Sequence, residues 1–568
     1  MEKSEADQLF SQAIELQQSG SPDQAQPLYE RILAAFPAYP HVPHLLGVIV
    51  SQRGNWYLAR RLIESSLLTQ SSDPDALANL GWVLVNLGLH DKALARCDQA
   101  IALNPGHARA QLTLGLALRM MGRFGEAITS FERVLQLQPA SAEALNYRGQ
   151  CQHALAQYAA ALQSYDRALA NSPQYADVLN NRGASLTLLD RHEEALESFA
   201  GALALQPRFA EAHFNLGMGL HTAKRYKEAL AHFEAALQLR PDYPEALMHR
   251  AFALQRLRTL PHDCLASLDR AIALRPGYFE AINGRANVLG QFEQYQEALD
   301  NYDLALTIRP DFPETHINRG HALRELGRLS EAADAYRHAL RLGGDSQAGL
   351  FALAAMGQEA PPPVAPADYI VNLFDGYAER FDEHLVGKLQ YRAHERLCEA
   401  VLAQHLAAPV DVLDLGCGTG LCAPLLAPVA RSMTGVDLAP KMLEVAGKRG
   451  LYSSLVESDA AQFLQSQPPQ SFDVVVSTDV FIYIGDLQPV FSGVKKTIRP
   501  GGLFGFSIEA SDTEDFVLQP TRRYAQSTAY IRRLAGEHGF EVLDMQPAAI
   551  RKEHGQDIAG YVAVLRAA

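Results

Sequence analysis

A proline recurs every 34 residues through the larger, N-terminal part of this 568-residue chain. One step of 35 interrupts the series, which consists of Pro105, Pro139, Pro173, Pro207, Pro241, Pro276 and Pro310. A fixed period of this length is the sequence signature of a repeat array, in which one supersecondary unit is copied along the chain. This part of the chain is therefore expected to fold as an array and not around one central core.

Three further columns keep the same period. Ten residues after each proline position stands a small residue: Ala13, Gly47, Gly81, Gly115, Gly149, Gly183, Gly217, Ala251, Ala286 and Gly320. Another small residue stands twelve positions before it, and a large one, such as Tyr29, Phe131, Tyr165, Phe199, Phe233, Tyr302 or Tyr336, stands eight before it. Small residues let two helices cross closely. The pattern resembles the tetratricopeptide repeat, which has two antiparallel helices per unit.

Residues 4–344 hold ten such units with one inserted residue. Because one hairpin cannot bury its apolar face alone, we expect the units to stack into an all-α solenoid with a concave inner wall. Asparagine stands two positions before the small residue in four units, at Asn79, Asn181, Asn215 and Asn318. These amides are candidates for binding an extended peptide or protein in the groove. The alternative is that they solvate an exposed helix face.

A different composition follows the last repeat. Leu350, Phe351 and Leu353 belong to an apolar stretch that we expect to cap the solenoid. Residues 360–366 then contain four prolines, and this composition predicts a stiff, extended spacer. The predicted organisation is therefore a solenoid over residues 4–344, a cap and proline-rich linker over 345–367, and a separate domain over 368–568.

Composition excludes several classes of partner. The net charge of −14 argues against general binding to nucleic acid, which depends on clustered Lys and Arg. No apolar run is long enough for a membrane span, and the charged N-terminus does not resemble a signal peptide, so a cytoplasmic location is expected. The six cysteines lack CxxC spacing, and we predict no metal site. The sequence leaves the oligomeric state open.

A glycine-rich turn is the first candidate ligand-binding motif in the predicted domain over residues 368–568. A short apolar strand runs through Asp414 into Gly416, Cys417, Gly418, Thr419 and Gly420, and a helix is predicted after it. Glycines at such a turn let the backbone approach a ligand, and the start of a helix leaves N–H groups free to bind it. A second strand ends at Asp437, about 20 residues later, where a carboxylate can accept hydrogen bonds from ribose hydroxyls.

Three more motifs complete the pattern, and together with the first two they indicate a family. The five segments are VLDLGCGTG, GVD, SDA, FDVVVS and RPGG. In this order they resemble the class I S-adenosylmethionine-dependent methyltransferases. The resemblance implies an α/β domain with a seven-stranded, mostly parallel, Rossmann-like sheet and S-adenosylmethionine as cofactor. The helix "LFDGYAERFDEHL" and two later segments further resemble the bacterial methyltransferases that carry tetratricopeptide repeats.

The resemblance also implies roles for individual residues. Gly416, Cys417, Gly418 and Gly420 would line the methionine part of the cofactor, with Ser477 nearby at the end of the fourth strand, and Asp414 would hold the ammonium group. Asp437 would bind the ribose, and Asp459 with Ala460 would bind the adenine, on which Leu438 and Met442 would pack. Tyr377 would lie over the cofactor as part of a lid. The alternatives are a strand-end charge for Asp414, helix caps for Asp437 and Asp459, and simple packing for Tyr377.

Methyl transfer needs a base only when the acceptor carries a proton. The candidates are Asp479, Tyr483, Glu509 and His554, and each also has a purely structural interpretation. Our leading hypothesis is a methyltransferase whose solenoid recruits a protein, either as substrate or as carrier of one. The alternatives are a methyltransferase acting on a small molecule or glycan while the repeats dock to a biosynthetic complex, and a scaffold that binds the cofactor without turnover.

Overall fold

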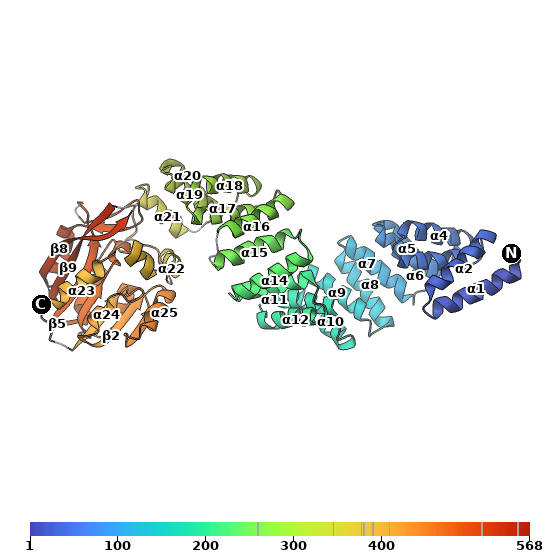
Figure 1. Ribbon diagram of the computed structural model, residues 1–568, viewed down its shortest axis with the longest axis horizontal. Coiled ribbons are helices and arrows are strands. Elements are labelled where there is room, and N and C mark those ends of the chain that lie inside the picture. Colours follow the sequence, from blue (N-terminus) through green and yellow to red (C-terminus); the bar gives the residue numbers. More distant parts are fainter. Residues whose placement is uncertain are drawn as a thin grey trace. The chain divides into compact units, whose positions relative to one another are not determined.

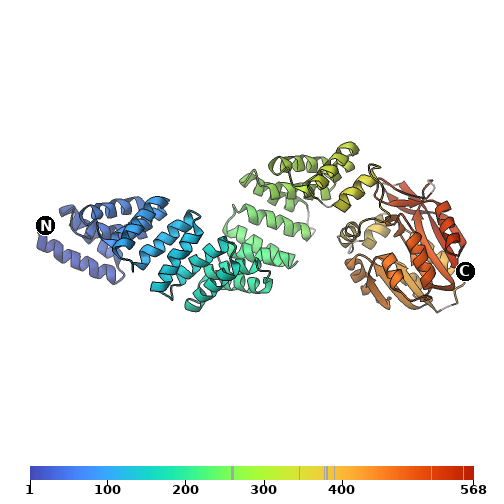
Figure 2. The same cartoon turned by 180° about the vertical axis from the view of Figure 1, so that it is seen from behind.

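The computed structural model describes residues 1–257, 261–344, 346–376, 378, 381–388, 391–407, 409–512, 515–553 and 556–568. The chain forms two compact units, Met1–Gly284 and Arg285–Ala568. Figure 1 colours the elements along the sequence, and Figure 2 shows them from behind. The first unit contains helical hairpins, whereas the second contains the last hairpins and a β-sheet domain.

Helices α1 to α20 pair into ten hairpins within the described residues, as the period predicts. The helices of the first unit are α1 (Lys3–Gln18), α2 (Pro22–Ala35), α3 (Val42–Gln52), α4 (Trp56–Thr69), α5 (Pro74–Asn86), α6 (His90–Leu103), α7 (Ala108–Met120), α8 (Phe124–Leu137), α9 (Ala142–Ala154), α10 (Tyr158–Asn171), α11 (Ala176–Thr187), α12 (His192–Leu205), α13 (Ala210–Thr222), α14 (Tyr226–Leu239), α15 (Pro244–Arg256) and α16 (Pro261–Leu274). The next helix, α17 (Phe279–Gln291), crosses the boundary between the units. The second unit adds α18 (Tyr295–Ile308), α19 (Pro313–Glu325), α20 (Leu329–Arg341) and α21 (Ser346–Ala355).

The small-residue column is explained by the aromatic column of the same repeat. A Cβ atom built on Gly149 would lie 2.5 Å from Cε1 of Tyr165, and one built on Gly183 would lie 2.6 Å from Cε1 of Phe199. Both rings are almost completely buried. The first helix of each repeat therefore lies directly on the ring supplied by the second, which confirms the close crossing predicted from the sequence.

The β-sheet domain has a seven-stranded sheet in the order β3-β2-β1-β4-β5-β9-β8. Its strands are β1 (Val410–Leu415), β2 (Ala430–Asp437), β3 (Ser454–Glu457), β4 (Phe472–Ser477), β5 (Ile498–Glu509), β8 (Phe540–Glu553) and β9 (Gln556–Ala567). Strands β1 to β5 are parallel, and β9 is antiparallel to both of its neighbours. A separate pair, β6 (Phe516–Leu518) and β7 (Tyr524–Gln526), forms a small hairpin. The mostly parallel sheet confirms the predicted fold class.

Helices cover both faces of this sheet, as parallel sheets require. Val474 and Val476 of β4 pack in one cluster with α23 (Ala393–Leu402) and α24 (Ala423–Leu426). Val475, between them, packs in the opposite cluster with α26 (Ala460–Ser466), α27 (Gln488–Thr497) and α28 (Thr528–Glu537). The alternation follows from the period of two in a strand. With both faces covered, the ends of the strands are left to form a site.

The proline-rich segment does not stand free as the predicted spacer. The carbonyl of Pro363 accepts hydrogen bonds from the N–H groups of Gly485 and Asp486 at 2.8 and 3.0 Å. Ala365 N–H donates to the Tyr483 carbonyl at 2.9 Å, and Val364 forms an antiparallel bridge with Ile484. Proline lacks an N–H donor but keeps its carbonyl acceptor, so an extended proline-rich segment can still pair with a neighbouring chain. The segment is extended, as predicted, but it is part of the domain surface.

Candidate functional site

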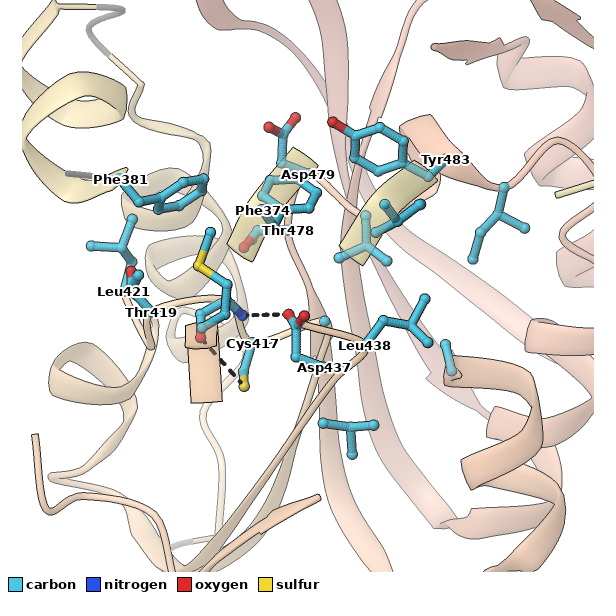
Figure 3. A pocket seen from close by; sticks show the side chains of 18 of the residues that line it. Phe374, Phe381, Cys417, Thr419, Leu421, Asp437, Leu438, Thr478, Asp479 and Tyr483 are labelled. Carbon is cyan, nitrogen blue, oxygen red and sulfur yellow. Dashed lines mark hydrogen bonds between the residues drawn. The ribbon is translucent and has the colours of Figure 1, made fainter. Parts of the chain in front are cut away.

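A pocket lies at the carboxyl ends of β1, β2, β3 and β4 (Figure 3). Its polar lining comes from the glycine-rich turn and from the acids that follow the strands. Its apolar lining comes from the segment before β1 and from residues after the strands, such as Leu438, Met442 and Val480. Of the residues predicted from the sequence, Gly416, Cys417, Gly418, Asp437, Leu438, Met442, Asp459, Ala460, Asp479 and Tyr483 line it. Asp414, Gly420 and Ser477 are absent from the described lining. Tyr377 and His554 lie outside the described residues.

The turn after β1 requires glycine at three positions. Gly416, Gly418 and Gly420 have φ angles of 74°, 53° and 83°, in the left-handed region that glycine adopts without a Cβ clash. A Cβ atom on Gly416 would also lie 2.2 Å from Cγ2 of Val480. The turn is held on β2, because the N–H groups of Gly416 and Cys417 both donate to the Val436 carbonyl, at 2.7 and 2.9 Å.

Asp437 connects the second strand to this turn. Its Oδ2 accepts the Gly418 N–H at 2.8 Å, and its Oδ1 accepts the Ala439 N–H at 2.9 Å. Burial raises the pKa of this carboxyl group, while the backbone hydrogen bonds act in the opposite direction. Backbone N–H groups of Gly418, Leu438 and Ala439 bind this carboxylate, and its two oxygens together keep lone-pair capacity for a ligand. The geometry therefore suits a ligand that presents two neighbouring hydroxyl groups.

Asp414 lies behind the turn. Its side chain is 1% exposed and accepts a hydrogen bond from the Tyr452 hydroxyl at 2.6 Å. Burial raises the pKa of Asp414 to about 7. The Tyr452 hydroxyl is a neutral partner, so Asp414 can still bind a cationic group of a ligand. Its predicted interaction with an ammonium group stays a prediction.

Two other predicted cofactor residues have clear structural roles. Asp459 caps α26, because its Oδ1 accepts the N–H groups of Ala461 and Gln462 at 2.9 and 3.0 Å. This confirms the capping interpretation without removing Asp459 from the pocket lining. Ser477 is buried and its hydroxyl donates to the Leu415 carbonyl at 2.8 Å, which ties β4 to β1.

The pocket has an apolar wall that the sequence motifs did not indicate. It comes largely from α22 (Ala367–Asp375) and the segment after it, which contribute Ile370, Phe374, Phe381 and Leu385. Phe374, Phe381 and Leu385 lie in the segment LFDGYAERFDEHL, in which the sequence analysis had singled out only Tyr377 for a place at the cofactor. The segment is fastened to the glycine turn, because the carboxylate of Asp382 binds both the Thr419 hydroxyl and the Arg449 guanidinium.

Asp479 and Tyr483 lie at one side of the pocket (Figure 3). Asp479 has a left-handed φ of 60°, and its Oδ1 accepts a hydrogen bond from Arg551 at 2.8 Å. Arg551 is 2% exposed and also pairs with Glu509. Burial raises the pKa of Tyr483 above its usual range, so the phenol stays neutral. Whether either residue acts as a base remains a prediction.

The predicted asparagines of the solenoid bind other side chains. Asn181 donates to Asn146 Oδ1 at 3.1 Å, and Asn215 donates to Asn180 Oδ1 at 2.9 Å, in each case across a repeat boundary. Asn318 donates to Asn287 Oδ1 at 3.1 Å, and Asn79 contacts Nε2 of His44 at 2.8 Å. All four are half-buried, so each keeps part of its hydrogen-bonding capacity. Their role in partner binding stays a prediction.

No helix in the described part of the chain is long and apolar enough to cross a membrane. Among the same described residues, no group of three or more His, Cys, Asp or Glu side chains is placed to hold a metal ion.

Comparison with known proteins identifies both parts of the chain. Residues 413–506 match the methyltransferase domain family, and residues 74–140, 112–176, 189–244 and 313–346 match tetratricopeptide repeat families. A ubiquinone biosynthesis O-methyltransferase from Idiomarina loihiensis is 34% identical over 110 residues, which are 19% of this chain and 45% of that protein. The chain thus spans under half of that relative's length.

Two other similar proteins carry the same kind of domain. A probable S-adenosylmethionine-dependent methyltransferase from Mycolicibacterium smegmatis is 31% identical over 158 residues, 27% of this chain and 60% of that protein. A methyltransferase structure from Methanosarcina mazei is 18% identical and covers 29% of this chain and 96% of its own, with a TM-score of 0.26. The sheet order, the glycine turn and the family match agree. This chain combines tetratricopeptide repeats with a class I S-adenosylmethionine-dependent methyltransferase domain.

Proposed function

We propose that the protein transfers a methyl group from S-adenosylmethionine and uses its repeats to recruit a protein, as substrate or as carrier of one. The observation that carries the proposal is the convergence of the glycine turn, Asp437 and Asp459 in one pocket. These groups come from the ends of three adjacent strands, where ligands of open α/β sheets bind. The polar groups suit the sugar hydroxyls and the polar edge of the base of a nucleoside, and the apolar wall suits the faces of the base.

The residues present fit this cofactor. Asp437 would accept hydrogen bonds from the ribose hydroxyls, and Leu438 and Met442 would pack on the adenine. When bound, S-adenosylmethionine supplies a methyl group on a positively charged sulfur. Phe374 and Phe381, which contact each other with ring centroids 5.9 Å apart, would exclude water from the reacting atoms. The remaining task of the chain is to align the acceptor, because an in-line displacement depends on orientation.

The acceptor side of the pocket is polar and strongly held. Asp479 is fixed by Arg551, and its N–H donates to the Ser507 hydroxyl at 2.9 Å. The Tyr483 ring is fixed edge-on against Phe374, at 5.6 Å between centroids and 88° between planes. A rigid carboxylate and a neutral phenol at one side of the pocket would orient an acceptor that carries a hydroxyl or amine proton.

The alternatives concern the acceptor and the turnover. The similarity to enzymes named for ubiquinone biosynthesis favours a small-molecule acceptor, with the repeats docking to a biosynthetic complex. However, that match covers less than half of the relative, so it does not carry over an acceptor. The third possibility, a scaffold that binds the cofactor without turnover, is disfavoured by the polar acceptor side of the pocket.

Calorimetry with S-adenosylmethionine tests the cofactor site. We expect the full chain to bind and Asp437→Ala to bind at least about tenfold more weakly, because the two hydrogen bonds to the ribose involve a charged acceptor. Asp557→Ala removes an exposed acid of the same domain and is the matched control. Equal heats for the wild type and Asp437→Ala would remove the proposed site.

Transfer of labelled methyl groups into a cell lysate tests recruitment. The full chain is compared with residues 346–568, a fragment that keeps α21 and the docked proline-rich segment but lacks α1 to α20. Label in a protein band with the full chain alone supports recruitment by the repeats. Label confined to small molecules with either protein would contradict it and favour the second hypothesis.

A further inference from the structure

Helix α22 contacts the cofactor pocket on one face and helix α21 on another. Ile370 and Phe374, four residues apart, lie on the face that lines the cofactor pocket. Tyr369 lies in a cluster with Phe351 of α21, the helix that follows the last repeat. The C-terminal end of α22 is fastened to α25 (Pro440–Lys448), because Asp375 Oδ1 accepts the Lys441 N–H at 3.1 Å. A displacement of α22 would therefore move the pocket wall.

Tyr369 is held by groups from two directions. The Phe351 ring contacts it at 5.3 Å between centroids, and the guanidinium carbon of Arg522 lies 4.9 Å from the centre of the Tyr369 ring. This second contact is a cation–π interaction, which is stronger where the charge has lost water. Phe351 also lies 6.4 Å from Tyr524 of β7, so the cap helix, the β6–β7 hairpin and α22 form one packed group.

The turn between β6 and β7 directs Arg522 onto this ring. Arg522 has a φ of 63°, an uncommon conformation for a residue with a long side chain. The turn is closed by two hydrogen bonds, from Arg522 N–H to the Gln519 carbonyl at 2.9 Å and from Gln519 N–H to the Arg523 carbonyl at 2.8 Å. The strained backbone conformation therefore occurs at a residue whose side chain contacts α22.

The charge of Arg522 also acts on the last repeat. Burial is the largest effect on the pKa of His321 in α19 and lowers it to about 3, and the charges of Arg522 and Arg324 add to it. His321 is therefore neutral, and its Nδ1 contacts the Tyr336 hydroxyl of α20 at 2.9 Å. The contacts that join the end of the solenoid to the pocket wall run through α21, because α20 packs against α21 and Phe351 of α21 contacts Tyr369.

We propose that Tyr369 and Arg522 are positioning residues for the cofactor site, through which the cap and last repeat hold α22 against the pocket. In this proposal the repeats have a second role besides recruitment, because the end of the solenoid supports the wall formed by Ile370 and Phe374. The part that concerns donor affinity rests on the proposed function. The part that concerns the placement of α22 does not.

The test uses full-length Tyr369→Leu, Arg522→Gln and Tyr369→Phe. We expect the first two to weaken binding of S-adenosylmethionine about tenfold, because they remove the ring or the cation. Tyr369→Phe keeps the ring and should restore near wild-type binding. Arg240→Gln is the matched control, because Arg240 makes the same kind of contact with Tyr243, at 4.2 Å, within the first unit. This control should bind like the wild type.

Hydrogen exchange of residues 367–375 in protein without cofactor is the second readout. We expect Tyr369→Leu and Arg522→Gln to exchange faster there, with β1 unchanged. If Tyr369→Leu does not fold, Arg522→Gln decides the result. Normal exchange in α22 together with unchanged affinity in Arg522→Gln would overturn the inference. A wild type that binds no S-adenosylmethionine would instead overturn the proposed function, and the exchange of α22 would still decide the positioning role.

Discussion

Glycine serves different purposes in the repeats and in the methyltransferase domain. Gly115, Gly149, Gly183 and Gly217 lie inside helices, and none of them has a positive φ angle. Each is small because an aromatic ring from the next helix fills the space beside it. In the methyltransferase domain, Gly416, Gly418 and Gly420 have positive φ angles, and they build the turn that faces the pocket.

The difference shows which kind of substitution each region tolerates. Alanine occupies the glycine column at Ala13, Ala251 and Ala286, and all three are fully buried. The constraint in the repeats is therefore one of volume, which a small shift of a ring can relieve. The constraint in the turn is one of backbone conformation, which neighbouring side chains cannot relieve.

Buried polar groups differ between the regions in the same way. Among the described residues of the first unit, the buried polar side chains are those of Ser, Thr, Asn and one His. The second unit buries three charged residue types, at Asp414, Glu509 and Arg551. Burying an ionisable group is costly unless it is paired or neutral. The free energy of unfolding of the methyltransferase domain should therefore depend on pH more strongly than that of the solenoid.

The largest predicted effect is the pH dependence caused by Asp414. Its pKa is raised from 3.8 to about 7, so the folded state keeps a proton that the unfolded state has lost between these values. The free energy of unfolding should fall by about 1.4 kcal/mol for each pH unit from about 4 to about 7 and level off above. Asp414→Asn should remove the part of this slope that Asp414 contributes, whereas Asp437 and Glu509, whose pKa values burial also raises, keep theirs.

Alkylation of the buried thiol of Cys398 in urea measures this change, with each rate divided by that of the unfolded chain at the same pH. Cys97 of the solenoid is the internal control, and its protection should not follow the same slope. An Asp414→Asn variant that keeps the wild-type slope would show that another group causes it.

The second effect is that of Gly416→Ala on cofactor binding. Alanine at this position would have to adopt the left-handed backbone of Gly416, and its methyl group would lie 2.2 Å from Cγ2 of Val480. Together these should cost about 3 kcal/mol, or roughly a hundredfold in affinity for S-adenosylmethionine, provided that the domain stays folded. Calorimetry measures the affinity, and far-ultraviolet circular dichroism checks the fold. Normal affinity would mean that the turn does not approach the cofactor.

The parts that could be predicted from the sequence are those that depend on local constraints. The period of 34 and its glycine–aromatic pairs specify helices that contact their neighbours, so the array could be read from spacing alone. The turn at Gly416 could be predicted because few residues adopt its φ angle. The acids after the strands could be predicted because the ends of parallel strands meet at one edge.

What could not be predicted are pairings between distant segments. Arg551 binds Asp479, 72 residues earlier, and Asp382 binds Arg449, 67 residues later. Nothing in the local pattern selects these partners. The asparagine column illustrates the same limit within the repeats, since its members bind Asn146, Asn180 and Asn287, which lie outside the column. Pairing depends on which side chains the finished fold brings together.

The smallest predicted effect is that of Gly149→Ala in the solenoid. The added Cβ would lie 2.5 Å from Tyr165, so the ring must shift, but alanine already occupies this column at Ala13 and Ala286, in repeats whose aromatic column holds Tyr29 and Tyr302. We therefore expect a loss of only about 1 kcal/mol in the free energy of unfolding, at the low end for overpacking.

Since the two tryptophans, Trp56 and Trp82, belong to repeats, their fluorescence during urea unfolding reports on the solenoid. Because each repeat contacts only its neighbours, the loss should stay in the array and leave affinity for S-adenosylmethionine unchanged. A loss as large as that expected for Gly416→Ala would show that the repeats, too, are constrained by backbone conformation and not by volume.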